Sequence, residues 1–430
     1  MTTGIVIASP TSGAGKTTIT LGLLRAMKNR GAQVRPAKSG PDYIDPGYHH
    51  SAAGTHCVNL DAWAMPRERL LRLAANEGML LVEGAMGLFD GAPPNGKGST
   101  ADLAATLGLP VILVIDASGQ SQSVAAVYRG FSTHRNDVNV AGVIFNRVSG
   151  TRHERLVKNA LERAGAVVFG AVHRDERIGL ASRHLGLKQA MEHAGLEDLI
   201  EDIATIMESR VDIPAVIAAA GPITGLESGS CGQYGISPPA QRIAVASDVA
   251  FGFAYPHLLA DWRRTGAEIL PFSPLRDEAP SASAELVILP GGFPELHAGR
   301  LATASKFRRG VCAAKAVYGE CGGYMVMGDG LVDAEGQRHA MLGLLRLETS
   351  FAERKLHLGY RRLTALRGPF QGSFTGHEFH YTTTLKARGE PVFQVQDAEG
   401  VELPPAGLSN GVASGSFVHL IDRSSPETPQ

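Results

Sequence analysis

The sequence predicts an α/β protein with two units, the first built on a doubly wound, mostly parallel sheet. Its 430 residues suffice for two or three domains at about 150 residues each. An apolar fraction of 44% and a charged fraction of 19% are typical of an ordinary globular chain. Short β-branched runs alternate with helical stretches, as expected of strands buried on both faces of a parallel sheet.

The elements follow in a regular order along the chain. The first half carries five predicted strands, at residues 4–9, 80–84, 111–116, 140–146 and 167–172. Residues 221–241 are rich in Gly, Ser and Pro without periodicity, which predicts a linker. After it the clearest strands are residues 242–247, 284–292 and 315–321. We therefore expect a first domain over residues 1–220, a linker over 221–241 and a second domain over 242–430.

Charge and cysteine content exclude several classes of protein. The 41 basic and 42 acidic residues nearly cancel, so no global field gathers nucleic acid or an anionic membrane. The four cysteines form no CxxC pair, which favours a reducing, cytoplasmic setting over a disulfide framework or zinc ribbon. The longest apolar run, residues 109–117, is too short to span a bilayer, and the N-terminus leads into a strand rather than a signal peptide.

A phosphate-binding loop follows the first strand. Residues 9–27 read SPTSGAGKTTITLGLLRAM, and the predicted helix directly follows the glycines. Pro10 replaces a Gly of the strict P-loop pattern, yet the strand before and the helix after are both present. Lys16 is expected to reach the β- and γ-phosphate oxygens, and Thr17 to bind Mg²⁺. The predicted nucleotide-binding residues here are Ser12, Gly13, Ala14, Gly15, Lys16, Thr17 and Thr18.

Two polar clusters lie at strand ends, on the expected carboxyl edge of the same sheet. They are KSGPDYIDPGYHH at residues 38–50 and VEGAMGLFDG at residues 82–91. Phosphoryl transfer needs carboxylates that hold Mg²⁺, and Glu83 ends an apolar strand where such a ligand is expected. Taken alone, Asp45 could be a turn residue and Glu83 a helix cap. With the P-loop present, we predict Thr17, Asp45 and Glu83 as metal ligands.

Two further residues are assigned to the nucleotide. Lys38 stands at the start of the first polar cluster as an additional cation for ATP. Asn146 ends the strand at residues 140–146, and its amide offers a donor and an acceptor that could bind an adenine edge. The alternative for Asn146 is an ordinary turn residue at a strand end.

The second half carries thiol chemistry. The segment AVYGECGGYMVMG at residues 316–328 is a strand, the G-x-C-x-G relative of a nucleophile elbow, and a helix. The helix N-terminus favours a thiolate and supplies oxyanion N–H groups. We therefore predict Cys321 as the nucleophile, whereas Cys312 reads as a packed helical residue.

The thiol needs a general base and an oxyanion site. His419, in ASGSFVHLID at residues 413–422, is the preferred base, with His377, His380 and His297 as competing candidates. The predicted oxyanion-binding residues lie in LPGGFPE at residues 289–295 and directly after the nucleophile. They are Gly291, Gly292 and Gly322. A plain strand-ending turn is the alternative for the glycine pair.

The two halves together resemble a known family. The first resembles the dethiobiotin-synthetase-like P-loop group, and the second resembles class I glutamine amidotransferases of the cobalamin-biosynthesis type. The motifs, in family order, are GAGKTT, GPDYIDPGYH, EGAMGLFDG, SRHLGL, LPGGFPE, GECGGYM, GHEFHY and GSFVHL. The chain is thus similar to the cobyrinate or hydrogenobyrinate a,c-diamide synthases. The implied fold is a P-loop domain followed by an α/β glutamine amidotransferase domain.

The resemblance implies a mechanism. Glutamine is hydrolysed at Cys321 through a thioester, with His419 as general base, and the ammonia passes to the first domain. There ATP, with Mg²⁺, phosphorylates a corrinoid carboxylate, and ammonia displaces the phosphate, at the c and then the a side chain. Asp42, Tyr43, Asp45 and Asp90 become candidates for substrate binding. A homodimer is implied as well.

One position departs from the pattern of class I amidotransferases. They often carry a Glu two residues after the histidine, where this chain has Ile421. The sequence therefore predicts a Cys-His dyad, or an orienting acid supplied from elsewhere. Glu378 in GHEFHY is one such candidate.

Other functions remain open at this stage. Cobyric acid synthase shares both domain types but has an amide-rich segment in place of GPDYIDP, and nickel-sirohydrochlorin a,c-diamide synthase is a further alternative. A partitioning-type ATPase switch is a third. The neutral charge, the Cys321 elbow and Thr11, which replaces the signature lysine of those switches, argue against it.

Overall fold

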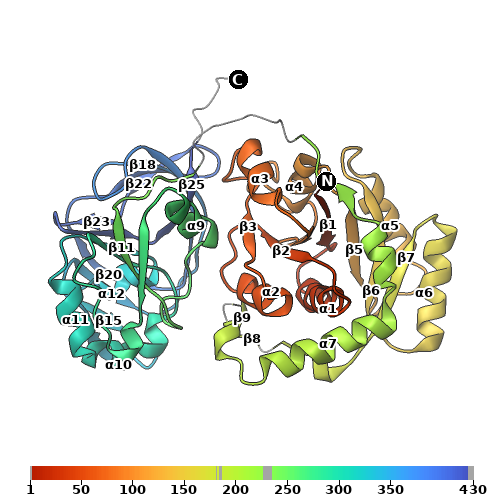
Figure 1. Ribbon diagram of the computed structural model, residues 1–430, viewed down its shortest axis with the longest axis horizontal. Helices are drawn as coiled ribbons and strands as arrows, with labels where there is room; N and C mark the ends of the chain where they lie inside the picture. The colour runs from red at the N-terminus through yellow and green to blue at the C-terminus, as the bar shows by residue number, and fades with distance from the viewer. Residues whose placement is uncertain (1, 181, 184–185, 226–234, 425–430) are drawn as a thin grey trace. The chain divides into compact units, whose positions relative to one another are not determined.

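The computed structural model describes residues 2–180, 182–183, 186–225 and 235–424. The chain divides into two compact units, Met1–Gly232 and Gln233–Gln430, and each has its own layers of strands and helices (Figure 1). Among the described helices, none combines the length and apolar character needed to cross a bilayer.

The first unit is built on a parallel sheet in the order β3-β2-β4-β1-β5-β6-β7. All neighbouring pairs along this path are parallel. Because the carboxyl ends of parallel strands meet at one edge, the loops after β1, β2 and β4 lie close together there. The strands are β1 (Thr3–Ala8), β2 (Val34–Ser39), β3 (Val58–Leu60), β4 (Met79–Glu83), β5 (Val111–Asp116), β6 (Val140–Val148) and β7 (Val168–His173).

Helices connect these strands. The helices α1, α2, α7 and α8 share one hydrophobic core with inward-facing residues of the sheet such as Ile5, Leu81 and Ile112. On the first unit, α3 also contacts α4 and α5 contacts α6. The helices are α1 (Lys16–Asn29), α2 (Asp45–Ala53), α3 (Arg67–Ala74), α4 (Thr100–Leu107), α5 (Val124–Thr133), α6 (Thr151–Arg163), α7 (Leu196–Arg210) and α8 (Ile213–Ala218).

The predicted linker falls in two parts. Residues 226–234 lie outside the described residues. At its start, Gly221–Pro222 form the short strand β10, which pairs with β1. Near its end, the carbonyl of Ile236 accepts a hydrogen bond from the indole of Trp262 in the second unit. The side chains of SRHLGL at residues 182–187 are likewise outside the description, although its backbone contains the strands β8 (Ser182–Arg183) and β9 (Gly186–Leu187).

The second unit has a parallel sheet in the order β12-β11-β13-β14-β24-β23, in which only the edge strand β23 is antiparallel among the pairs described. A separate core fills the unit. The elements are β11 (Arg242–Ala246), α9 (Pro256–Arg264), β12 (Glu268–Phe272), β13 (Leu286–Leu289), α10 (Ala298–Thr303), α11 (Ser305–Cys312), β14 (Val317–Glu320), α12 (Gly322–Val326), β23 (Leu408–Ser409) and β24 (Ala413–Ser416).

Two further sheets complete the second unit. An antiparallel sheet in the order β22-β21-β18-β19-β25 sets His377 directly opposite His419. Its strands are β18 (His357–Ala365), β19 (Ser373–His380), β21 (Phe393–Gln396), β22 (Glu402–Ala406) and β25 (Val418–Arg423). The other, in the order β16-β15-β17-β20, contains β15 (Gly330–Val332), β16 (Arg338–Ala340), β17 (Arg346–Ser350) and β20 (Thr383–Arg388).

The observed architecture confirms the predicted fold class. Each strand expected from the sequence is present within a few residues of its predicted bounds. The prediction omitted β2 and β3, because β2 contains Pro36 and two basic residues and β3 has three residues only. It also omitted the two smaller sheets of the second unit, whose strands are rich in polar residues.

Candidate active sites

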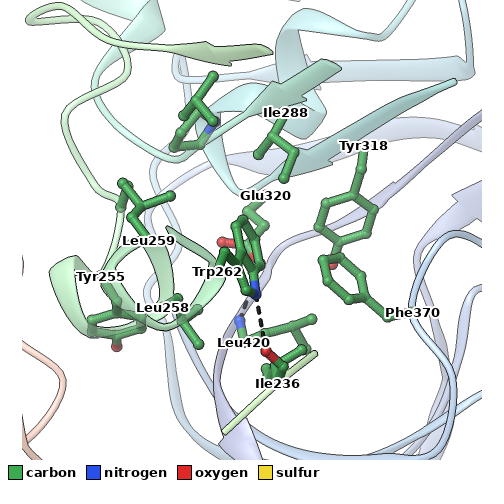
Figure 2. Close-up of a pocket in the computed structure, with 13 residues that line it drawn as sticks. Ile236, Tyr255, Leu258, Leu259, Trp262, Ile288, Tyr318, Glu320, Phe370 and Leu420 are labelled. Carbon is green, nitrogen blue, oxygen red and sulfur yellow. Dashed lines mark hydrogen bonds between the residues drawn. The ribbon is translucent and has the colours of Figure 1, made fainter. Parts of the chain in front are cut away.

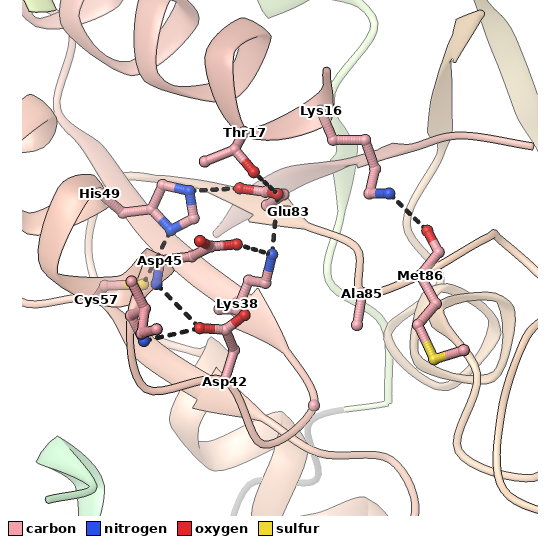
Figure 3. A network of polar contacts seen from close by, with 12 residues as sticks. Lys16, Thr17, Lys38, Asp42, Asp45, His49, Cys57, Glu83, Ala85 and Met86 are labelled. Carbon is pink, nitrogen blue, oxygen red and sulfur yellow. Dashed lines mark hydrogen bonds and ion pairs between the residues drawn. The ribbon is translucent and has the colours of Figure 1, made fainter. Parts of the chain in front are cut away.

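The P-loop joins β1 to α1. Gly13 and Gly15 have φ values of 77° and 91°, in the left-handed region that favours glycine. Lys16 is the first residue of α1, and its ammonium donates to Ser9 Oγ at 2.9 Å and to the Met86 carbonyl at 2.5 Å (Figure 3). Burial lowers the pKa of Lys16 to about 8. Ser12 and Gly13 are exposed at the tip of the loop, and Thr18 is half-buried in the first turn of the helix.

Glu83, the last residue of β4, contacts several polar side chains at the carboxyl edge of the sheet. One of its oxygens accepts from the hydroxyl of Thr17 at 2.7 Å and from the ammonium of Lys38 at 2.9 Å. The other lies 2.6 Å from Nε2 of His49 (Figure 3). Lys38 also binds Asp45 at 2.5 Å. The structure therefore brings three predicted metal ligands and one predicted nucleotide ligand into a single network.

The charges in this network are set by burial and by close partners. Burial alone would raise the pKa of Glu83, but Lys38 and His49 hold it below its ordinary value. Burial lowers the pKa of Lys38, yet Asp45 and Glu83 raise it well above the usual range. Burial and the nearby Asp42 raise the pKa of Asp45 to about 6. At neutral pH the site thus contains an ionised, buried carboxylate at Glu83 beside a hydroxyl oxygen and a second carboxyl group.

The predicted substrate-binding residues lie in the two loops beside this network. Asp42 lies just before α2, and its carboxylate accepts the N–H groups of Ile44 and Asp45 at 2.8 and 2.9 Å. Tyr43 is half-buried next to it, and Asp90 is exposed in the loop after β4. Asp90 accepts from the N–H of Gly87 at 2.9 Å. Their role towards a substrate stays a prediction.

Asn146 contacts the P-loop. Its amide nitrogen donates to the Ala14 carbonyl at 2.8 Å, and its oxygen accepts from the N–H of Arg147 at 2.9 Å. A Cβ added to Gly15 would lie 2.1 Å from the amide nitrogen. Asn146 therefore stabilises the P-loop by a hydrogen bond from β6. Its predicted contact with adenine stays a prediction.

Sequence reasoning missed His49. The ring is fully buried and joins Glu83 to the thiol of Cys57, whose Sγ lies 3.7 Å from Nδ1. A signal was available, because His49 follows Asp45 by four residues on α2. Residues at that spacing share one face of a helix, so the helix that presents Asp45 to the network also presents His49.

In the second unit, Cys321 occupies a strained turn between β14 and α12. Its φ of 48° is rare for a residue with a Cβ. The glycines two residues before and after Cys321 are required by close packing. A Cβ added to Gly323 would lie 1.8 Å from the Leu289 carbonyl. One added to Gly319 would lie 2.5 Å from the sulfur of Met327. The side chain is 4% exposed, with Sγ 3.9 Å from the carbonyl oxygen of Phe379.

His419 and Cys321 meet across Gly291. A Cβ at Gly291 would lie 2.8 Å from Nε2 of His419 and 3.3 Å from Cβ of Cys321. The other two predicted glycines stand beside them: a Cβ on Gly322 would lie 3.0 Å from the backbone nitrogen of Gly292. The structure thus gathers all the residues predicted for the thiol site into one place.

The resting thiol and imidazole are both uncharged. Burial raises the pKa of the Cys321 thiol well above its usual range, and the carboxylate of Glu295 adds to this effect. Burial also lowers the pKa of His419 to about 3, with His377 and His380 as further causes. Formation of a thiolate at Cys321 and an imidazolium at His419 would therefore require the transfer of one proton between these neighbours.

The competing histidines have other surroundings. His377 is the cross-strand neighbour of His419, and His297 ends a short 3₁₀ helix. His380 lies 3.1 Å from Glu378 and stacks on Phe417.

His357, Glu378 and His380 bring three potential metal-binding atoms within 4.8 Å of one another. However, Arg361 lies 2.7 Å from Glu378, so this carboxylate already faces a cation. Burial would raise the pKa of Glu378, but His380 and Arg361 lower it to about 2.

Glu320 is a residue that sequence reasoning missed as a site residue. It directly precedes the nucleophile, and one carboxylate oxygen lies 3.6 Å from Nδ1 of His419. The other accepts from the N–H of Leu420 at 3.2 Å. Its side chain lies in a pocket with apolar walls that include Trp262 and Phe370 (Figure 2). No sequence motif predicts that Glu320 lies close to His419, because their distance depends on how β14 and β25 are arranged in the fold.

Two family models match the chain, one in each unit. Residues 5–187 match the CobQ/CobB/MinD/ParA nucleotide binding domain, and residues 242–426 match the CobB/CobQ-like glutamine amidotransferase domain. The first match contains the P-loop and Glu83, and the second contains Cys321 and His419.

Curated relatives extend the match over nearly the whole chain. A hydrogenobyrinate a,c-diamide synthase of Rhizobium meliloti (strain 1021) is 53% identical, over 97% of this chain and 99% of the relative. Enzymes with the same name from Brucella abortus and Rhodobacter capsulatus are 52% and 50% identical, each over 97% of this chain and 98% of the relative. The chain belongs to the hydrogenobyrinate a,c-diamide synthase family.

Proposed function

We propose that this protein uses ATP and glutamine to convert the a and c carboxylates of hydrogenobyrinate, or of its cobalt-containing counterpart cobyrinate, to amides in cobalamin biosynthesis. The observation that carries the proposal is the meeting of Cys321 and His419 across Gly291, in a chain that also has a P-loop beside an ionised Glu83. A thiol nucleophile releases ammonia from glutamine, and a P-loop site activates a carboxylate to receive it.

In the second unit, His419 takes the thiol proton and Cys321 sulfur attacks the side-chain carbonyl carbon of glutamine. The C–N bond then breaks, and ammonia leaves with the proton from His419. Water hydrolyses the remaining thioester to glutamate and restores the thiol. The backbone N–H groups near Gly292 and Gly322 are the proposed donors to the oxyanion.

In the first unit, a corrinoid carboxylate oxygen attacks the γ-phosphorus of ATP, and ADP leaves. Ammonia then attacks the acyl carbon, and inorganic phosphate leaves as the amide forms. Lys16 neutralises charge on the phosphates, which requires it to exchange its present contacts with Ser9 and Met86 for phosphate oxygens. Activation is needed because a carboxylate has no leaving group of its own.

A magnesium ion would be held by Thr17, Asp45 and Glu83. The donor atoms fit, because Mg²⁺ prefers oxygen ligands and Glu83 is ionised and buried. Binding of the ion would require Lys38 to give up its present contacts with Glu83 and Asp45. When bound, the ion supplies charge neutralisation at the transferred phosphoryl group. We further expect a homodimer in the cytoplasm, where reducing conditions keep Cys321 a thiol.

Mass spectrometry tests the proposal. Hydrogenobyrinate and cobyrinate are incubated separately with the protein, ATP, Mg²⁺ and glutamine. Each carboxylate converted to an amide lowers the mass by about one dalton, so a loss of about two, mapped to the a and c side chains, supports the proposed function. Turnover of ATP without a mass change on either substrate contradicts it. The comparison of the two substrates also decides whether cobalt is required.

A further inference from the structure

The imidazole of His419 has two nitrogens in different surroundings. Nε2 lies on the Gly291 side, where Cys321 Cβ also lies. Nδ1, the other ring nitrogen, lies 3.6 Å from a carboxylate oxygen of Glu320. A histidine acts as base with one nitrogen only when its proton resides on the other, so the group facing Nδ1 decides which nitrogen is available.

Glu320 is itself held in one place. It is the last residue of β14, two residues after Tyr318, so both side chains lie on the same face of the strand and line the same pocket (Figure 2). The N–H of Leu420 donates to the second carboxylate oxygen at 3.2 Å. Leu420 follows His419 in β25, so the single carboxylate of Glu320 lies close to both the backbone N–H of Leu420 and the ring of His419.

We propose that Glu320 is a positioning residue for the thiol site: its carboxylate accepts the Nδ1 proton of His419, keeps Nε2 facing Cys321, and stabilises the imidazolium that forms when the thiol proton moves to Nε2. The inference rests on the proposed glutamine hydrolysis. It places the orienting acid on the residue before the nucleophile, in a chain that has Ile421 where class I amidotransferases often have a glutamate.

Most charged groups around the pair oppose the transfer of the proton from Cys321 to His419. His377 and His380 oppose a positive charge on His419, and Glu295, Glu378 and Glu320 itself oppose a negative charge on Cys321. Glu378 is held by Arg361 and His380. Burial raises the pKa of Glu320 to about 8, so near neutral pH the group is largely protonated in the resting site, and a cation that faces it stabilises its carboxylate form. The imidazolium created by catalysis is such a cation.

The test compares Glu320→Gln with Glu320→Asp and with Tyr318→Phe. The first removes the charge but keeps an oxygen for Leu420, the second restores the charge on a shorter arm, and the third removes a polar atom from the same face of β14. We expect kcat for glutamine hydrolysis to fall about 10²–10⁴-fold in Glu320→Gln, with little change in KM. Glu320→Asp recovers part of the loss, and Tyr318→Phe stays near wild type.

A second readout separates positioning from a structural role. The rate at which iodoacetamide alkylates Cys321 is measured against pH by peptide mass spectrometry, with the exposed Cys312 as control in the same sample. Glu320→Gln has two opposing effects on Cys321: it makes the imidazolium of His419 less stable, and it removes the direct repulsion between Glu320 and the thiolate. If the positioning role dominates, the midpoint of the alkylation rate against pH rises for Cys321 by about one pH unit or more. A midpoint that falls contradicts the role. The midpoint for Cys312 does not move.

The outcomes distinguish the inference from the proposed function. If wild type hydrolyses glutamine and Glu320→Gln keeps both its kcat and its alkylation midpoint, the positioning role is refuted. If wild type hydrolyses no glutamine, the proposed function itself fails. Ammonium-dependent synthesis serves as the folding control, because it does not use Cys321; a Glu320→Gln protein that retains it and loses glutamine hydrolysis supports the inference.

Discussion

Substitution of Gly291 by alanine tests the geometry of the thiol site most directly. The added Cβ would lie 2.2 Å from Cε1 and 2.8 Å from Nε2 of His419. Carbon atoms pack at about 3.5–4.0 Å, so the ring must retreat by more than about 1 Å. His419 is 1% exposed on β25, the last strand of its sheet, and little room is available for it to move. A misplacement of about 1 Å costs about 10²-fold in rate.

We therefore expect glutamine hydrolysis by Gly291→Ala to fall about 10²-fold, while synthesis with added ammonium stays near wild type. The assay is release of glutamate from glutamine, run beside ammonium-dependent amidation of the corrinoid. Gly299→Ala is the matched control, because its added Cβ would lie 3.7 Å from Cε1 of His339, an ordinary van der Waals contact. Full glutamine hydrolysis by Gly291→Ala would refute the placement of His419 against Cys321.

Four other variants probe the thiol site of the second unit and the P-loop site of the first. Cys321→Ser should abolish glutamine use and keep ammonium-dependent synthesis, and loss of both activities would contradict two separate sites. Lys16→Ala should remove synthesis with either nitrogen source, measured as amide formation. His419→Ala should match Cys321→Ser in glutamate release; if His380→Ala does so instead, the base is wrongly assigned. Glu83→Gln should lower the free energy of unfolding by about 3–5 kcal/mol at pH 7, since it removes one partner of a buried ion pair. The pKa of Glu83 is lowered on folding, so the stability that its charge contributes is lost as the pH falls below the ordinary value of 4.5. The difference in unfolding free energy between wild type and Glu83→Gln, measured by urea titration, should therefore shrink at low pH.

Much of the fold and part of each site follow from local sequence patterns. The P-loop is encoded by consecutive residues, because glycines at positive φ and a lysine at the first helical position are needed within one turn. The elbow at Cys321 is local for the same reason. Strands such as residues 111–116 are predicted correctly to the residue, since an unbroken β-branched run has few alternatives once both faces are buried.

The remaining features depend on contacts between distant residues. Glu320 and His419 are 99 positions apart in numbering but only 3.6 Å apart at their polar atoms, and β14 and β25 belong to different sheets. Likewise, His49 joins Glu83 only because α2 lies over the end of β4. A single sequence contains no periodic signal for such pairs, so the orienting acid could be expected but not located.

The turn at Cys321 has a consequence for how this chain can evolve. A side chain held at a φ of 48° costs about 1–3 kcal/mol, which the rest of the unit must offset. Glycine at this position would release that strain, so the variant without a nucleophile is expected to be the more stable protein. Selection for stability alone would therefore replace Cys321 by glycine in a lineage supplied with free ammonium. Its retention requires continued selection for nitrogen taken from glutamine.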